Sequence, residues 1–315
     1  MGLLMEPYLE LEKKYAKFAG SKYAVSCNSG TSALHLALLA LGVGSGDEVI
    51  VPDFTMAACV FAVSYTGAKP VFADVSTLNY SILPSEIERL INKKTKAIMV
   101  VHVYGRLAPM KEILAIAKKH KIPVIEDACE AQGAVYKSYA DVTVYSFYKN
   151  KIIASEEGGM LTTDNKKLAE KASYLKNMAF DKGHTYFHAD IGFNYRMSNS
   201  HAKLALESLK QYVANNKKRR EIESQYNKYF PMPKRDAVWF YEISVPKTLK
   251  KEILSKISMA RGSFKPLSTF PMYGAKLGMP NARQLSESLI LLPASPSLTK
   301  QDVQSISEKI LRIIK

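Results

Sequence analysis

The sequence predicts an α/β protein in which helices cover a mainly parallel β-sheet, followed by a smaller α/β domain. Between about residues 23 and 165, short β-branched runs alternate with helical segments, which is typical of parallel strands joined by helices. Several of these runs are almost wholly apolar, as expected for strands covered on both faces. With 315 residues and 47% hydrophobic content, the chain is long enough for one large domain and a smaller one.

Local patterns place the individual elements of the large domain. Strands are expected at residues 48–51, 71–74, 97–103, 124–126 and 142–147. The segment TSALHLALLALGVG is apolar almost all round, which predicts a deeply buried helix that ends at Gly42. The N-terminal segment and PMKEILAIAKKHK have the residue spacing of amphipathic helices.

The second half of the chain begins with helical segments. One helix is expected near residues 166–177 and one long helix from about 200 to 229, because no proline interrupts either segment. A Pro-Met-Pro sequence then marks a boundary, so we expect a large domain over residues 1–230 and a small α/β domain over residues 231–315. The small domain starts with the alternating segment AVWFYEISV and ends in the amphipathic helix DVQSISEKILRIIK.

Composition restricts the partners of the chain. Lys and Arg outnumber Asp and Glu by 44 − 29 = 15, which favours anionic ligands. The one dense basic run, residues 217–220, is interpreted as a solvated helix face and not as a nucleic-acid site. No apolar stretch reaches the roughly 18 residues of a membrane span. Early glutamates argue against a secretion signal and three distant cysteines fit a reducing compartment, so we expect a cytoplasmic protein without nucleic-acid, membrane or metal partners.

The segment NSGTSALHLAL carries the first chemical signal. It places Gly30, Thr31 and Ser32 at the start of the buried helix, where free backbone amides and the helix dipole favour an anion such as phosphate. An ordinary Ser/Thr cap followed by a core helix would give the same pattern. This segment alone therefore leaves both interpretations open.

Two later segments place charged residues at the carboxyl edge of the sheet, where open α/β folds bind ligands. In VIEDACEAQGA a buried strand ends at Asp127, whose carboxylate either pairs with a cation or caps a helix. In VYSFYKNKIIASEEGGM a strand is followed by Lys149 and Lys151. A lysine that attacks an aldehyde must lose its proton, and partial desolvation at a sheet edge favours that loss.

The order of these three features resembles that of pyridoxal-phosphate (PLP) enzymes with the aspartate-aminotransferase fold, a three-layer fold around a mainly parallel, seven-stranded sheet. More specifically, the chain is similar over nearly its whole length to the DegT/DnrJ/EryC1/StrS-type sugar aminotransferases. The similarity is carried by SGTSALHLALLALGVGSGDEVIVP, GAKPVFADV, VIEDACEAQGA, SFYKNKIIASEEGGM and GFNYRMSN. The resemblance implies pyridoxal 5'-phosphate as cofactor, with a nucleotide-linked keto sugar and glutamate as substrates.

The resemblance also implies the roles of individual residues. Lys151 matches the catalytic lysine that forms the Schiff base to the cofactor, and Asp127 matches the carboxylate that faces the pyridine nitrogen. Residues that match the surroundings of the cofactor are Gly30, Thr31, Ser32, Met56, Glu130, Ser146 and Asn194. Residues that match substrate contacts are Tyr148, His184, Tyr186, His188 and Arg196.

The stretch HTYFHADIGFNYRM, together with SFYKNK, resembles the branch that makes 4-amino-4,6-dideoxy sugars for cell-surface polysaccharides, the GDP-perosamine synthases. In such enzymes the residues that match Asn194 and Arg196 reach the active site of the neighbouring subunit, which implies a homodimer with shared sites. A 3-aminotransferase is an alternative within the family, and a structural histidine is an equal alternative for His188. A dehydratase is disfavoured, because the resembling dehydratases have histidine at the position of Lys151.

Several features depart from the pattern of the family. The N-terminus and the loop over residues 133–141 are short, and Met56 replaces an aromatic ring that usually lies against the cofactor. Glu156 replaces a usual glycine, which would strain the backbone if that position needs positive φ. These departures motivate a hypothesis from another class, a cofactor-binding but inert regulatory partner, whereas Asp127 and Lys151 favour the enzyme.

Overall fold

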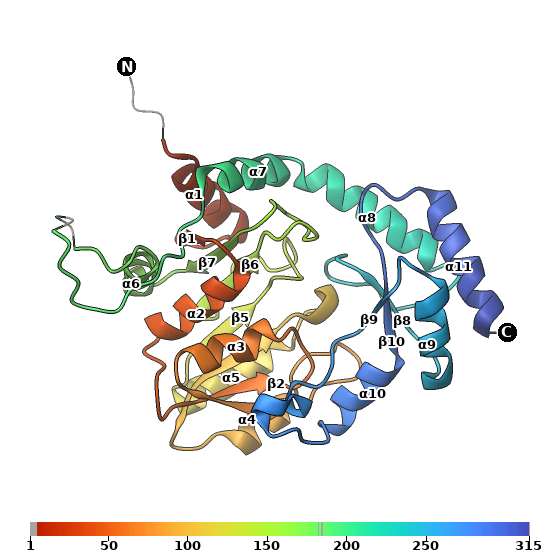
Figure 1. The fold of residues 1–315 in the computed structure, drawn as a ribbon, viewed down its shortest axis with the longest axis horizontal. Coiled ribbons are helices and arrows are strands. Elements are labelled where there is room, and N and C mark those ends of the chain that lie inside the picture. The colour runs from red at the N-terminus through yellow and green to blue at the C-terminus, as the bar shows by residue number, and fades with distance from the viewer. Residues whose placement is uncertain (1–4, 182, 184, 315) are drawn as a thin grey trace.

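The computed structural model describes residues 5–181, 183 and 185–314. Within them the main sheet has seven strands in the order β1-β7-β6-β5-β4-β2-β3 (Figure 1). They are β1 (Tyr23–Cys27), β2 (Glu48–Pro52), β3 (Lys69–Ala73), β4 (Thr95–Val101), β5 (Val124–Asp127), β6 (Val142–Ser146) and β7 (Gly159–Thr163). Strand β7 is antiparallel to both of its neighbours, and the other pairs are parallel. The predicted seven-stranded, mainly parallel sheet is confirmed.

Helices cover both faces of this sheet, which gives three layers. They are α1 (Pro7–Ala19), α2 (Gly30–Ala40), α3 (Ala58–Tyr65), α4 (Pro84–Leu90), α5 (Met110–His120), α6 (Lys166–Lys176), α7 (Asn199–Lys210) and α8 (Tyr212–Tyr226). Met99 of β4 belongs to the core that includes α2 and α3, whereas its neighbours Ile98 and Val100 belong to the core that includes α4 and α5. Successive side chains of a strand point to opposite faces, so an almost wholly apolar strand such as β4 needs both helical layers.

This part differs from the sequence-based expectations in two respects. Strands β1 and β7, which pair with each other, were not predicted, because YAVSC and GMLTT mix polar and apolar residues without a clear period. The single long helix expected over residues 200–229 is wrong. Two helices, α7 and α8, meet at Gln211 and follow each other along the top of the molecule (Figure 1).

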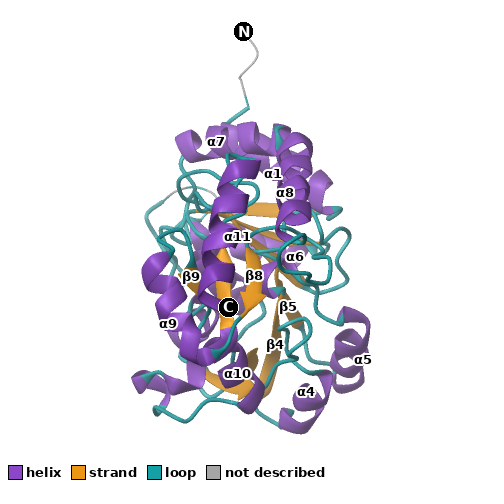
Figure 2. Cartoon of the chain, turned by 90° about the vertical axis from the view of Figure 1, so that its right-hand side faces the viewer, coloured by secondary structure: helices purple, strands orange, loops and turns teal. Residues whose placement is uncertain are grey.

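The C-terminal part has a sheet and a core of its own. Strands β8 (Tyr241–Ser244), β10 (Leu289–Leu292) and β9 (Arg261–Gly262) form an antiparallel sheet in that order. Its helices are α9 (Lys247–Lys256), α10 (Pro280–Ser288) and α11 (Lys300–Ile314), and Figure 2 shows α9 and α11 in front of the sheet. Ile222 and Tyr226 of α8 also enter this core. None of the helices formed by the described residues has the length and apolar character needed to cross a bilayer.

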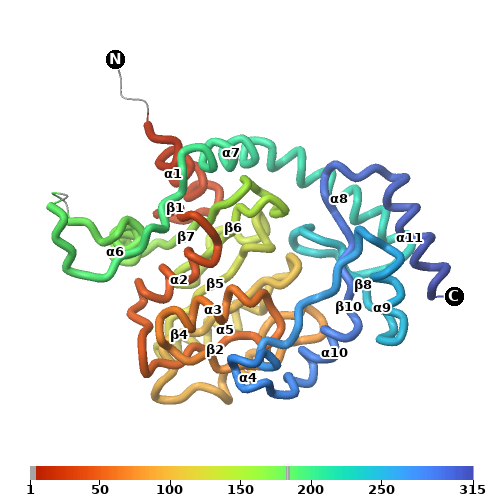
Figure 3. The backbone as a smooth tube through the Cα atoms, viewed as in Figure 1, coloured from red at the N-terminus to blue at the C-terminus, as the bar shows by residue number. Residues whose placement is uncertain are grey.

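The C-terminal part returns to the main sheet after β9. In Figure 3 the blue segment before α10 lies beside the orange segment around β2 and α3. Asp53, which is fully buried after β2, accepts hydrogen bonds from the backbone amide and the hydroxyl of Ser268, at 2.7 and 3.0 Å. Asp74 likewise accepts from the amides of Asn281 and Ala282 at the start of α10. The fully buried Asp53 and the half-buried Asp74, each one residue beyond the end of a strand, therefore hold the C-terminal segment in place.

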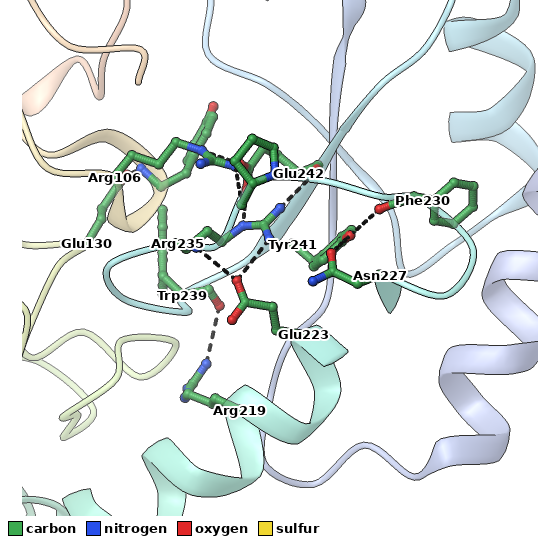
Figure 4. Close-up of polar contacts among 12 residues, drawn as sticks. Arg106, Glu130, Arg219, Glu223, Asn227, Phe230, Arg235, Trp239, Tyr241 and Glu242 are labelled. Carbon is green, nitrogen blue, oxygen red and sulfur yellow. Dashed lines mark hydrogen bonds and ion pairs between the residues drawn. The ribbon is translucent and has the colours of Figure 1, made fainter. Parts of the chain in front are cut away.

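A buried ionic network makes a second connection between the two parts (Figure 4). Glu242 of β8 is fully buried and lies between two guanidinium groups: Nε of Arg106 donates to Oε1 at 2.7 Å, and Nε of Arg235 donates to Oε2 at 2.6 Å. Arg235 also donates to Glu223 of α8 at 3.2 Å, and Glu223 accepts from Arg220 at 2.9 Å. The alternating charges compensate one another, which buried charges require.

Candidate active site

Two strand ends and one helix start meet at the carboxyl edge of the sheet. Asp127 is the last residue of β5, Ser146 is the last residue of β6, and Gly30 is the first residue of α2. A Cβ atom added to Gly30 would lie 2.9 Å from Cβ of Ser146 and 3.2 Å from Sγ of Cys129. Only glycine allows this approach, which places the N-terminus of α2 against both strand ends.

The start of α2 is capped from within the chain. Oγ of Ser29 accepts a hydrogen bond from the amide of Ser32 at 3.1 Å, and the hydroxyl of Ser32 donates to Oδ1 of Asn28 at 2.6 Å. The sequence left open whether this segment is an ordinary Ser/Thr cap. Such a cap is present, and Ser29 is the capping residue. Thr31 is half-buried. The positive end of the helix dipole still faces the strand ends, where it favours an anionic group.

Asp127 is a buried carboxylate without a cationic partner among the described residues. Oδ1 accepts from the amide of Cys129 at 2.9 Å, and Oδ2 accepts from the thiol of Cys59 at 3.3 Å. A buried carboxylate is costly unless it is paired. A protonated ring nitrogen of a ligand would supply the missing positive charge.

The structure distinguishes the two lysines that follow β6. Nζ of Lys151 lies 4.0 Å from Oε1 of Glu130, and the side chain is only 11% exposed. Lys149 is exposed and its Nζ lies 5.8 Å from the ring centroid of Tyr148. Of the two, Lys151 has the desolvated position near carboxylates that a Schiff-base lysine needs.

Glu130 is a second buried carboxylate of the site. It is 5% exposed, and burial raises its pKa to about 7, although the charge of Lys151 lowers the pKa in turn. Oε2 accepts from the amide of Tyr104 at 2.8 Å. Tyr104 has φ 55°, a left-handed conformation that is rare for a bulky residue and marks strain beside the site.

Trp239 is a site residue that the sequence did not indicate. The centroid of its ring lies 3.9 Å from Nζ of Lys151, and its indole N–H donates to the carbonyl of Asn150 at 2.9 Å. In the sequence it was one apolar residue of an alternating segment expected to open the small domain. The only signal in the sequence was that the chain has a single tryptophan.

The other predicted site residues are exposed. Met56, before α3, and Tyr148 are 54% and 37% exposed. Asn194 and Arg196 are exposed on a segment that runs beside the start of α2, where the carbonyl of Tyr195 accepts from the amide of Asn28 at 2.9 Å.

The predicted sugar contacts lie on the loop after α6. Tyr186 is 84% exposed, and His188 is exposed while its Nδ1 lies 2.8 Å from the carbonyl of Met178. His184 lies outside the described residues. Figure 1 shows the loop after α6 extending away from the main sheet.

Three further residues lie outside the site. His102 is fully buried, with Nε2 2.7 Å from Glu126 and Nδ1 accepting from the amide of Ala108, so its role is structural. The solvated face expected at residues 217–220 is wrong for Arg219. This side chain is 6% exposed and donates to backbone carbonyls. Glu156 is not among the described residues with positive φ, so the strain that depended on such a conformation does not arise.

Comparison with known proteins fits this geometry. Residues 5–311 match the profile of the DegT/DnrJ/EryC1/StrS aminotransferase family. The chain belongs to this family. It is 37% identical to GDP-perosamine synthase of Escherichia coli O157:H7, with 96% of this chain and 88% of the relative covered. It is 34% identical to GDP-perosamine synthase of Caulobacter vibrioides, with 95% and 87% covered.

Other relatives differ in the position that they aminate. The chain is 33% identical to UDP-N-acetyl-3-dehydro-alpha-D-glucosamine 3-aminotransferase of Acidithiobacillus ferrooxidans, with 96% of this chain and 88% of the relative covered. Among solved structures, NtdA of Bacillus subtilis with bound cofactor PMP has a TM-score of 0.90 at 29% identity, with 98% and 77% covered. The expected fold, family and enzyme class are confirmed: the chain is a sugar aminotransferase, and pyridoxal phosphate is its cofactor.

The described residues fit this cofactor. The start of α2 lies against the end of β6, where Gly30 packs on Ser146, and it offers backbone amides and the positive end of the helix dipole to a phosphate. Asp127 offers an unpaired buried carboxylate to the ring nitrogen, and Lys151 offers a largely buried amine to the aldehyde.

Proposed function

We propose that this aminotransferase transfers an amino group from glutamate to a nucleotide-linked 4-keto-6-deoxyhexose and yields a 4-amino-4,6-dideoxy sugar nucleotide of the GDP-perosamine type. One observation carries the catalytic part: the amine of Lys151 is largely buried beside Glu130 at the carboxyl edge of the sheet. Similarity to two GDP-perosamine synthases supports the sugar part. The proposed enzyme acts in the cytoplasm.

Different residues of the chain have different roles in the proposed reaction. When bound, the cofactor supplies an aldehyde and an electron-withdrawing ring that can stabilise a carbanion. Asp127 would hold the ring nitrogen in its protonated form. Lys151 would act as general base and acid at the substrate carbon. Glu130, with its pKa raised to about 7, can accept or return a proton beside the amine near neutral pH.

We further propose a homodimer in which each subunit completes the site of the other. The loop after α6 carries three apolar side chains that are strongly exposed in one chain: Tyr186 at 84%, Phe187 at 70% and Ile191 at 86%. Exposed apolar groups of this size mark an interface, and a partner subunit would bury them. In that arrangement Tyr186, His188 and Arg196 would contact the sugar in the site of the partner.

A 3-aminotransferase is the second candidate, supported by the similarity to an enzyme that aminates position 3. The deciding experiment incubates the enzyme with glutamate and a panel of GDP-, UDP- and dTDP-linked keto sugars. Mass analysis then identifies the aminated product and NMR locates the nitrogen. Amination of a 4-keto sugar is expected, whereas amination of 3-keto sugars alone would replace the first proposal by the second.

Two substitutions test the role of Lys151 directly. Lys151→Ala and Lys151→Arg remove the amine that forms the covalent bond, so both variants should lack the visible absorption band of the lysine-linked cofactor. Lys149→Ala, which changes the exposed neighbour, is the matched control and should keep the band. An undiminished band in Lys151→Ala would exclude Lys151 as the Schiff-base residue. Absence of any spectral change when glutamate is added to the wild type would favour an inert, regulatory protein.

A further inference from the structure

The C-terminal part of the chain delivers one aromatic ring to the catalytic amine. Trp239 lies just before β8, is 7% exposed, and has its ring centroid 3.9 Å from Nζ of Lys151. The hydrogen bond from its indole N–H to the carbonyl of Asn150 fixes the ring on the same turn that carries Lys151. Position and orientation of the indole are therefore both set relative to the amine.

Arg219 binds the backbone of the segment that carries Trp239 (Figure 4). Its Nη1 donates to the carbonyls of Trp239 at 3.2 Å, Val238 at 3.3 Å and Ala294 at 3.0 Å, and its Nη2 lies 3.5 Å from the carbonyl of Lys151. Burial lowers the pKa of the guanidinium to about 10. One buried cation on α8 thus ties the backbone of the lysine turn to the backbone that carries the indole.

Glu130 also lies near the amine. Its Oε1 lies 4.0 Å from Nζ of Lys151, while its Oε2 is held by the amide of Tyr104. The ring of Tyr104 is stacked on that of Trp239, with centroids 6.3 Å apart and planes 29° apart. The indole face and the carboxylate are therefore positioned by the same strained residue.

We propose that Trp239 is a positioning residue for Lys151, whose ammonium it holds in the site whenever the lysine is not bonded to the cofactor. The inference rests on the proposed catalytic role of Lys151. Tryptophan provides the strongest cation–π interaction of the aromatic residues, and the interaction strengthens when water is excluded. A free lysine side chain would otherwise sample many rotamers, whereas a held amine stays within reach of the next bond.

The first test measures how fast Lys151 becomes linked to the cofactor. Pyridoxal 5'-phosphate is added to cofactor-depleted full-length protein, the amine condenses with the aldehyde, water leaves, and the visible band appears. Trp239→Leu removes the π face and leaves a smaller apolar side chain, so it should slow this step about tenfold or more, whereas Trp239→Phe keeps an aromatic face and should retain much of the rate. Tyr273→Leu, which removes an aromatic ring of the C-terminal part that packs on Phe72, is the matched control.

Steady-state kinetics separate positioning from substrate binding. Trp239→Leu should lower kcat while the KM for glutamate stays within about threefold, because the interaction acts on the lysine and not on the substrate. A folded Trp239→Leu variant, checked by circular dichroism, that links the cofactor within about twofold of the wild-type rate would overturn the inference. Equal losses in the leucine and phenylalanine variants would point to packing alone and would overturn it too.

Fluorescence keeps the inference testable if Trp239→Leu does not fold. Because Trp239 is the only tryptophan, the emission of the unaltered protein reports on this one ring. Linking the cofactor to Lys151 should quench most of that emission, and unquenched emission would place the ring away from the amine. Failure of the proposed function has a different signature: the visible band would then persist in Lys151→Ala.

Discussion

Replacing Glu130 by glutamine should change how the stability of the cofactor-free chain depends on pH. Burial raises the pKa of Glu130 from an ordinary 4.5 to about 7, so the folded chain binds a proton more tightly there than the unfolded chain does. This pKa difference contributes to the free energy of unfolding. The contribution is fully present below pH 4.5 and is lost as the pH rises through about 7. Glutamine stays neutral throughout, so the variant should not show this loss.

The size of the effect follows from the shift. One pKa unit corresponds to about 1.4 kcal/mol, so the free energy of unfolding of the wild type should fall by about 3 kcal/mol relative to the variant over this range. Urea unfolding at several values between about pH 5 and pH 8 measures the difference directly. Other titrating groups are shared by both proteins, so their contributions cancel in the comparison.

Glu156→Gln is the matched control, because it removes one carboxylate from an exposed position of the neighbouring segment. Its stability should follow that of the wild type at each pH. Parallel curves for the wild type and Glu130→Gln would refute the reasoning, since they would mean that Glu130 titrates alike in the folded and unfolded chains. A wild-type curve that rises with pH relative to the variant would reverse the sign and refute it as well.

Two further predictions concern packing and buried charge. Glu242→Gln leaves Arg106 and Arg235 without their shared carboxylate and should lower the free energy of unfolding by about 3–5 kcal/mol, measured in urea; a loss below about 1 kcal/mol would show that solvent compensates the two cations. Gly30→Ala forces a Cβ atom against Ser146 at 2.9 Å, so it should destabilise the chain by about 1–3 kcal/mol and weaken cofactor binding in equilibrium dialysis. Unchanged affinity would mean that α2 can move without affecting the phosphate site.

The sequence alone determined the class of fold and which residues to expect at the carboxyl edge of the sheet. Apolar strands such as β4 must be covered on both faces, which is why a helix-covered parallel sheet could be predicted from hydrophobic runs. Asp127 and Ser146 could be placed because strand ends can be read from the same runs. Resemblance to a family then distinguished Lys151 from Lys149, two residues apart, and the structure gives the physical difference in burial.

Only the tertiary structure decided which distant residues surround the amine. Trp239 lies 88 positions beyond Lys151 and carries no local mark of its role, because its contact depends on how the C-terminal part folds back. Arg219 looked like part of a solvated basic face, yet the packing of α8 buries it among carbonyl groups. Periodicity reports which side of an element is apolar, whereas long-range contacts depend on the three-dimensional packing of whole elements, which no local pattern encodes.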